Sequence, residues 1–400
     1  MQNDFKLVEY ERQGSSPCDT KFLGEEAATA ALKFHSSIDG YQPTPLVSLD
    51  ALATHLGIGG IYLKDESYRF GLNAFKVLGG SYAIASYIAK RLGEPLEQLP
   101  FSKMISPQVK EKLGEITFIT ATDGNHGRGV AWTAHKLQQN SVVYMPKGSA
   151  AERLANIQAL GAKASITDVN YDAAVAMANT DAEKNGWVMV QDTAWDGYED
   201  IPKWIMQGYT TMALEAHRQL EGIKPTHIFL QAGVGSFAGA ITGFFADIYG
   251  AERPIITIVE PNKADCIFRS AQANDGTRHF VTDDMSTIMA GLACGEPNTI
   301  SWEVLKSCCD FFISCPDFVA AKGMRVLGSP TGQDTRVISG ESGAVTAGLV
   351  AAIMENPDLA PLKEKLKLNK NSRVLLFSTE GDTDKENYRK ILWDGLYPSY

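Results

Sequence analysis

The chain has 400 residues, of which 44% are hydrophobic and 21% charged, and its formal net charge is −10. This composition excludes a disordered chain, a collagen-like chain and a small disulfide-stapled scaffold, and the length predicts about two or three domains. An acidic chain without a basic run lacks the electrostatic footprint for nucleic acid or an anionic membrane, so neither is expected as a partner.

The N-terminal segment 1–14 carries charges where a secretory signal needs an apolar stretch. Glycines and polar residues interrupt the most apolar long window, 228–249, which is therefore a poor membrane span. We expect a cytoplasmic protein. None of the six cysteines forms a Cys-x-x-Cys pair, which argues against a zinc-ribbon or thioredoxin site, and no metal site is expected. Reduced thiols are the default for a cytosolic protein, and a Cys266–Cys294 disulfide is the alternative.

Short apolar segments alternate with longer amphipathic ones along the chain. The expected strands are 60–64, 116–120, 141–145, 164–168, 188–191, 228–231, 255–259 and 374–378. The expected helices are 76–91, one ending at Lys136, 150–160 and 171–185, and the segment 94–114, with three prolines, is expected to be a surface insertion. Uniformly apolar strands alternating with helices indicate an α/β fold with parallel-rich sheets and helices on both faces.

The first motif with chemical potential is Gly71-Leu-Asn-Ala-Phe-Lys76, at the start of an expected helix. A lysine there could form a Schiff base with an aldehyde cofactor if its surroundings lower its pKa from the usual value of about 10.4. An ordinary solvated lysine is the alternative for this motif taken alone.

The second motif, Thr-Asp-Gly-Asn-His-Gly-Arg-Gly at 122–129, follows a strand and precedes a helix. Backbone N–H groups at such a helix start can bind a carboxylate. The candidate substrate-binding residues are Thr122, Asp123, Gly124, Asn125 and His126. Taken alone, the loop is equally compatible with a tight turn.

The third motif, Gly233-Val234-Gly235-Ser236, lies between a strand and a helix, where glycines let the backbone wrap a phosphate. Its spacing is one residue off the dinucleotide fingerprint, and Glu260 ends the next strand, where a ribose-binding acid would lie. A nicotinamide-dependent dehydrogenase therefore remains an alternative at this point.

The fourth motif, Ser378-Thr-Glu-Gly-Asp382, follows the last expected strand. A hydroxyl there can meet a ligand at the carboxyl edge where parallel sheets bind cofactors. A turn with a capping Ser or Thr is the alternative.

Together and in this order, the four motifs resemble the fold type II pyridoxal-phosphate enzymes, which include the serine and threonine dehydratases and the tryptophan synthase β-subunit. The resemblance extends upstream to 43–46 and 63–67 and covers the chain from about residue 40. It implies pyridoxal 5′-phosphate as the cofactor. The implied cofactor contacts are Lys76 as covalent anchor, Gly233, Val234, Gly235 and Ser236 at the phosphate, Asn125 at the 3-hydroxyl and Thr379 at the pyridine nitrogen.

Two departures from the dehydratases narrow the resemblance. Asp123 stands where they have serine, and Leu72-Asn-Ala74 stands where they have Thr-Gly-Ser. With longer strings such as TDGNHGRGVAW (122–132) and IMAGLACGEP (288–297), these departures resemble the members that eliminate ammonia from D- and L-2,3-diaminopropionate, yielding pyruvate and a second ammonia. A carboxylate at Asp123 could bind the second substrate amine by a charge-assisted hydrogen bond. A serine or threonine dehydratase on the same scaffold is the alternative.

The resemblance also implies the catalytic residues: Lys76 as the base for the L-enantiomer, Asp192 as the base for the D-enantiomer, and Asp123 at the leaving amine. From the residues alone, Asp192 before Thr-Ala-Trp is better interpreted as a helix N-cap. The resemblance further implies a homodimer whose cofactor lies between two domains. We expect a smaller substrate-loop domain at 77–200 and a larger, discontinuous cofactor-binding domain at 1–76 and 201–400.

Overall fold

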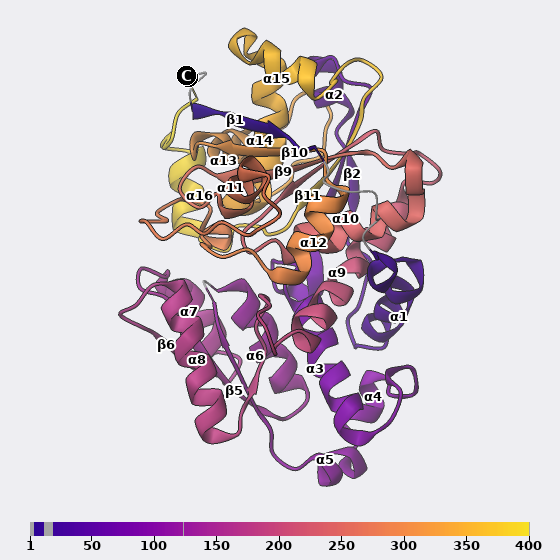
Figure 1. Ribbon diagram of the computed structural model, residues 1–400, viewed down its shortest axis with the longest axis vertical. Helices are drawn as coiled ribbons and strands as arrows, with labels where there is room; N and C mark the ends of the chain where they lie inside the picture. The colour runs from indigo at the N-terminus through magenta and orange to yellow at the C-terminus, as the bar shows by residue number, and fades with distance from the viewer. Residues whose placement is uncertain (1–3, 12–18, 123, 400) are drawn as a thin grey trace.

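The computed structural model describes residues 4–11, 19–122 and 124–399, so Asp123 and Cys18 lie outside the described residues. Two helix-covered sheets lie one above the other, with α3 (Val77–Leu92) and α9 (Asp200–Gln219) packed together between them (Figure 1). Within the described residues, the larger sheet has seven strands in the order β1-β10-β9-β8-β11-β3-β2 and the smaller has four in the order β6-β5-β4-β7.

The larger sheet is parallel at its centre and antiparallel at both edges. Its strands are β1 (Lys6–Glu9), β2 (Leu46–Ser48), β3 (Gly60–Asp65), β8 (His227–Gln231), β9 (Ile255–Pro261), β10 (Phe311–Cys315) and β11 (Arg373–Ser378). The smaller sheet is parallel throughout and contains β4 (Thr117–Ala121), β5 (Asn140–Met145), β6 (Lys163–Ile166) and β7 (Val188–Met189). The expected parallel-rich α/β fold is confirmed, although the sequence analysis missed β1, β2 and β10.

Helices cover both faces of the larger sheet and flank the smaller one (Figure 1). The remaining α-helices are α1 (Glu25–Ser36), α2 (Asp50–Leu56), α4 (Phe101–Met104), α5 (Pro107–Leu113), α6 (Asn125–Lys136), α7 (Ala151–Gln158), α8 (Tyr171–Asn185), α10 (Ser236–Tyr249), α11 (Cys266–Ala273), α12 (Thr299–Cys308), α13 (Phe318–Gly328), α14 (Glu341–Glu355), α15 (Ala360–Lys365) and α16 (Lys385–Leu392). The four expected helices are confirmed to within about two residues at each end, which is the usual uncertainty of a helix boundary.

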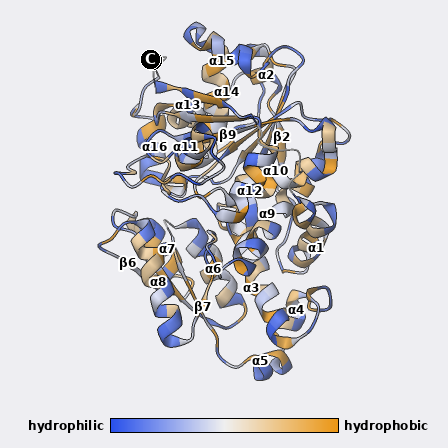
Figure 2. Cartoon of the chain, in the orientation of Figure 1, coloured by the Kyte–Doolittle hydropathy of each residue, from blue (hydrophilic) through white to orange (hydrophobic). Residues whose placement is uncertain are grey.

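The two faces of the larger sheet support separate hydrophobic cores because successive side chains of a strand point to opposite sides. Ile228 and Leu230 of β8 pack into the core that contains α9 and α10, whereas Phe229 packs into the core that contains α13 and α14. Figure 2 shows the hydrophobic colour gathered along the strands near β9 and along α10.

The segment 94–114 lies at the periphery of the molecule, as expected for an insertion, but it is not simply a surface loop (Figure 1). It folds into α4 and α5 after a short 3-10 helix. Five of its apolar side chains are buried in the core beside α3: Leu99, Phe101, Met104, Val109 and Leu113. The prolines therefore begin short helices, a position that proline tolerates.

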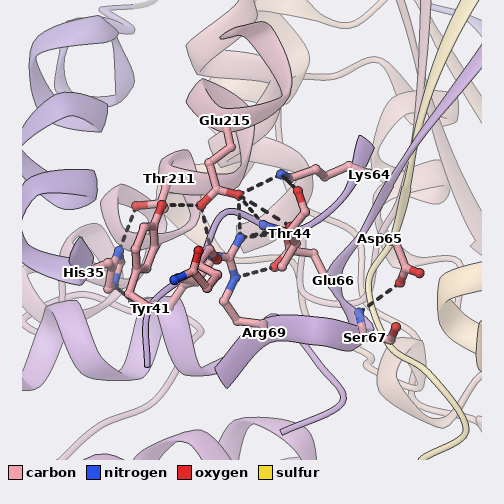
Figure 3. A network of polar contacts seen from close by, with 12 residues as sticks. His35, Tyr41, Thr44, Lys64, Asp65, Glu66, Ser67, Arg69, Thr211 and Glu215 are labelled. Atoms are coloured by element: carbon pink, nitrogen blue, oxygen red, sulfur yellow. Dashed lines mark hydrogen bonds and ion pairs between the residues drawn. The ribbon is translucent and has the colours of Figure 1, made fainter. Parts of the chain in front are cut away.

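A buried ionic network fixes the start of the segment that leads to Lys76 (Figure 3). Arg69 donates to both oxygens of Glu66 at 2.9 Å and to both oxygens of Glu215 at 2.8 and 2.9 Å. Lys64 Nζ lies 2.7 Å from Glu215, and all four side chains are at most 4% exposed. Because Glu66 and Arg69 belong to the 3-10 helix Glu66–Gly71, the network anchors the chain just before the first motif.

Of the helices in the described part of the chain, none combines the length and the apolar character that a membrane span requires.

Candidate active site

A cavity that opens to solvent brings together residues from all four motifs. It lies at the carboxyl ends of β4, β8 and β11, next to the start of α3, which is where sheets of this kind bind ligands. The lining includes Lys76, Thr122, Asn125, His126, Asp192, Gly233, Val234, Gly235, Ser236, Thr379 and Glu380.

Lys76 immediately precedes α3, and its Nζ contacts the carboxylate of Asp192. Asp192 is only 3% exposed. Burial alone would raise the pKa of this carboxyl, but the charges of Lys76 and His126 lower it to about 2. The N-cap interpretation of Asp192 is wrong, because the next helix, α9, begins only at Asp200. The structure therefore holds an ionised carboxylate against the lysine.

The second motif places three of its described residues on the cavity wall: Thr122, Asn125 and His126. The backbone N–H of Gly124 donates to Thr122 Oγ1 at 2.9 Å and is not part of the lining. His126 Nε2 lies 2.7 Å from the carbonyl oxygen of Val190. The role expected for Asp123 falls outside the described residues. The motif forms the turn before α6 and directs the start of this helix at the cavity.

The glycine-rich loop 233–236 leads directly into α10, so the positive end of the helix dipole faces the cavity. Gly235 has φ +99°, a conformation that favours glycine. Ser236 Oγ donates to the backbone carbonyl of Asp192, and Asn298 Nδ2 donates to Ser236 Oγ at 2.9 Å. The loop fits a phosphate, and it is tied to the segment that carries Asp192.

Thr379 lies at the end of β11 and lines the cavity, whereas the neighbouring Ser378 donates away from it, to Ser339 Oγ at 2.8 Å. Gln231 Nε2 donates to Thr379 Oγ1 at 2.9 Å. Since that bond uses an acceptor site of the hydroxyl, the hydroxyl proton is left to donate. A hydroxyl donor suits an unprotonated pyridine nitrogen, so Thr379 fits pyridoxal phosphate.

Glu260 argues against a nicotinamide site, since its carboxylate is used within the fold. It is 1% exposed and accepts hydrogen bonds from the backbone N–H groups of Ile267 and Phe268, at 3.0 and 2.6 Å. Glu260 therefore caps the start of α11 and presents no carboxylate to a ribose. The dehydrogenase alternative therefore lacks the ribose-binding acid that Glu260 was expected to supply.

Sequence reasoning missed two residues that organise the site. Glu380 lines the cavity and accepts from Asn125 Nδ2 at 2.6 Å, and Asn298 joins Ser236 to the carbonyl of Asp192. Glu380 lies within the fourth motif, so the sequence could have identified it as a candidate site residue. Asn298 lies outside the four motifs, and no local sequence pattern identifies it. Cys266 and Cys294 are both buried, and burial raises the pKa of the Cys266 thiol.

Comparison with known proteins gives the class first. The model of the family described as "Pyridoxal-phosphate dependent enzyme" matches residues 38–379. The chain belongs to this family. It has the fold type II architecture, and pyridoxal 5′-phosphate is its cofactor.

Within the family, the chain is 53% identical to diaminopropionate ammonia-lyase of Escherichia coli (strain K12), over 95% of this chain and 96% of that protein. A crystal structure of the Escherichia coli enzyme in complex with D-serine has a TM-score of 0.92, at 49% identity, and covers 98% of both chains. The L-threonine dehydratase of Staphylococcus aureus (strain USA300) is 25% identical over 88% of each chain. The tomato (Solanum lycopersicum) threonine deaminase, with a TM-score of 0.73 at 19% identity over 96% of both chains, shares the fold.

Proposed function

We propose that the chain is a carbon–nitrogen lyase that converts 2,3-diaminopropionate to pyruvate and two ammonia by β-elimination. The contact between Lys76 Nζ and the Asp192 carboxylate, in a cavity that also holds a phosphate loop, carries the proposal. The near full-length similarity to the Escherichia coli ammonia-lyase supports the substrate. A further crystal structure of that enzyme is described as a complex with an aminoacrylate-PLP azomethine reaction intermediate, which supports elimination.

We infer the cofactor contacts from the residues that line the cavity. Lys76 would hold the aldehyde carbon, the 233–236 loop the phosphate, Asn125 the 3-hydroxyl oxygen and Thr379 the pyridine nitrogen. When bound, pyridoxal phosphate withdraws electrons from the substrate α-carbon and so stabilises the carbanion left by proton removal.

The protein's own groups position the substrate and move its protons. The start of α6, with Thr122, Asn125 and His126, would bind the substrate carboxylate through N–H donors and the helix dipole, whereas Gly124, whose N–H donates to Thr122 Oγ1, would shape the turn. The Lys76 amine would remove the α-proton of the L-enantiomer, and the Asp192 carboxylate that of the D-enantiomer. Asp123 would hold the second amine as it leaves.

The assembly and location are proposed as well. We infer that the chain forms a homodimer in the cytoplasm. We also infer that the two sheets mark two domains: 77–200, and 1–76 with 201–400. The cavity lined by residues from both sheets supports a cofactor bound between them.

The proposal can be tested at Lys76, the proposed covalent attachment point of the cofactor. Lys76→Ala should abolish the visible absorbance of the bound cofactor and the release of pyruvate from diaminopropionate. The exposed Lys90, paired with Asp200, supplies the control Lys90→Ala, which should retain both. Borohydride reduction followed by peptide mass spectrometry should locate the label on Lys76. A label on another lysine, or no label, would overturn the proposal.

The alternative is a serine or threonine dehydratase on the same scaffold. Ammonia release from diaminopropionate and from serine, measured side by side, separates the two. Asp123→Ser should lower the ratio of diaminopropionate to serine turnover, because it removes the carboxylate proposed to bind the second amine. An unchanged ratio would remove Asp123 from that role.

A further inference from the structure

Glu380 is a buried acid on the cavity wall that the proposed chemistry does not use. It follows Thr379, is 2% exposed, and its carboxylate accepts three hydrogen bonds. Asn125 Nδ2 donates to Oε2 at 2.6 Å, Thr383 Oγ1 donates to the same oxygen at 3.1 Å, and the backbone N–H of Ser342 donates to Oε1 at 3.2 Å. A buried carboxylate with this many donors is held in one orientation.

The neighbouring acid Glu341 serves as a comparison for Glu380. Burial, together with a smaller contribution from the charge of Glu380, raises the pKa of Glu341 to about 7. Glu341 accepts from Asn387 Nδ2 and has no hydrogen bond to Asn125 among the described residues. The two adjacent acids therefore differ in role: Glu380 contacts the cavity residue, and Glu341 does not.

A charged carboxylate decides which end of an asparagine side chain faces it. The terminal amide carries an oxygen that only accepts and a nitrogen with two N–H donors, and the two ends have nearly the same shape. A carboxylate accepts but does not donate, so it attracts the nitrogen and repels the oxygen. With one N–H of Asn125 bound to Glu380, the second N–H remains available to the cavity that Asn125 lines.

We infer that Glu380 is a positioning residue that fixes the Asn125 amide so that it presents an N–H donor to the 3-hydroxyl oxygen of the cofactor. The inference rests on the proposed contact between Asn125 and that oxygen. The contact also joins the two halves of the site, since Asn125 begins α6 beside the smaller sheet and Glu380 follows β11 of the larger one.

A second hydrogen bond crosses the same junction. Arg153 of α7 donates to Thr383 Oγ1 at 3.2 Å, and Thr383 in turn donates to Glu380. Glu380 is therefore linked to the smaller-sheet side in two ways, directly through Asn125 and indirectly through Thr383, which accepts from Arg153. Loss of its carboxylate is expected to loosen the Asn125 amide without removing the Arg153 contact.

The experiment is a double-mutant cycle on cofactor affinity, measured by absorbance titration of the apoenzyme with pyridoxal phosphate. Glu380→Ala and Asn125→Ala should each weaken binding about tenfold, on the order expected for one hydrogen bond involving a charged group. Because Glu380 acts through Asn125, the double variant should also lose about tenfold rather than a hundredfold. Glu380→Gln, which keeps an acceptor oxygen without the charge, should recover part of the affinity. The matched control Glu341→Gln should bind the cofactor like the parent.

Two results would overturn the inference: parental affinity in Glu380→Ala, or additive losses in the double variant. If Glu380→Ala fails to fold, the same cycle can be measured with Glu380→Gln, because the losses of cofactor affinity in the single and double variants can be compared with either substitution. The titration requires no turnover, so its failure is distinguishable from failure of the proposed lyase activity, which the Lys76 label and the pyruvate assay decide separately.

Discussion

Replacing Glu215 by glutamine tests the buried network that anchors the approach to Lys76. The network balances two cations, Lys64 and Arg69, against two carboxylates, Glu66 and Glu215, and all four side chains are buried (Figure 3). The substitution removes one negative charge and leaves a cation without compensation. Breaking a buried ion pair at one partner costs about 3–5 kcal/mol, which is a large part of a typical free energy of unfolding of about 5–15 kcal/mol.

The assay is chemical denaturation of the holoenzyme followed by circular dichroism, with the Lys64→Met/Glu215→Gln double variant as the charge-balanced comparison. The double variant removes one cation with the carboxylate, so it should recover part of the lost stability. A loss below about 1 kcal/mol for Glu215→Gln, as for an exposed pair, would refute the reasoning. So would a double variant that is less stable than the single one.

Three further outcomes follow from the site. Asp192→Asn should slow turnover of the D-enantiomer by about 100-fold or more and that of the L-enantiomer much less; equal losses in steady-state assays would mean that the carboxylate acts through the lysine it contacts. Glu341 has a pKa of about 7 when folded and an ordinary value of 4.5, so its contribution to stability is present below pH 4.5 and is lost as the pH rises through 7. Glu341→Gln should therefore gain about 3 kcal/mol relative to the parent between pH 4.5 and 8, and a pH-independent difference in denaturation midpoints would contradict this. Gly235→Ala should weaken cofactor binding, since φ is +99° and an added Cβ would lie 2.9 Å from a side chain, whereas Gly276→Ala, at φ +80° in open space, should retain affinity. Equal cofactor affinity in the two glycine variants would contradict the proposed phosphate-binding role of the 233–236 loop.

Local patterns were sufficient for most of the central strands, although the interior strand β10 was missed despite its buried apolar sequence. The strands at 228–231 and 374–378 are apolar because both of their faces are covered, and the structure extends each by one residue, to His227–Gln231 and Arg373–Ser378. The edge strands β1 and β2 were missed because they are only four and three residues long and partly exposed, so they lack the apolar run. Burial of α4 and α5 was missed because proline and charge dominate the composition of 94–114.

The motif residues at 122–126, 233–236 and 379 were predictable because each group follows a strand, and ligands bind at the carboxyl ends of parallel strands. Their partners were not. Asn125 and Glu380 are 255 positions apart, and Ser236 and Asn298 are 62 apart, so only the folded chain reveals these hydrogen bonds. Asp192 is a further example: its neighbours in sequence suggested a helix cap, whereas the structure places its carboxylate in contact with Lys76, 116 positions away.

The bond from Ser236 to the Asp192 carbonyl has a consequence for how such an enzyme can diversify. The 233–236 loop, proposed to bind the phosphate, and the backbone at Asp192 are joined by this hydrogen bond, and Asn298 donates to both of its partners. Because these hydrogen bonds link the two segments, a displacement of one is expected to displace the other, so substitutions that change substrate choice are better tolerated elsewhere in the cavity.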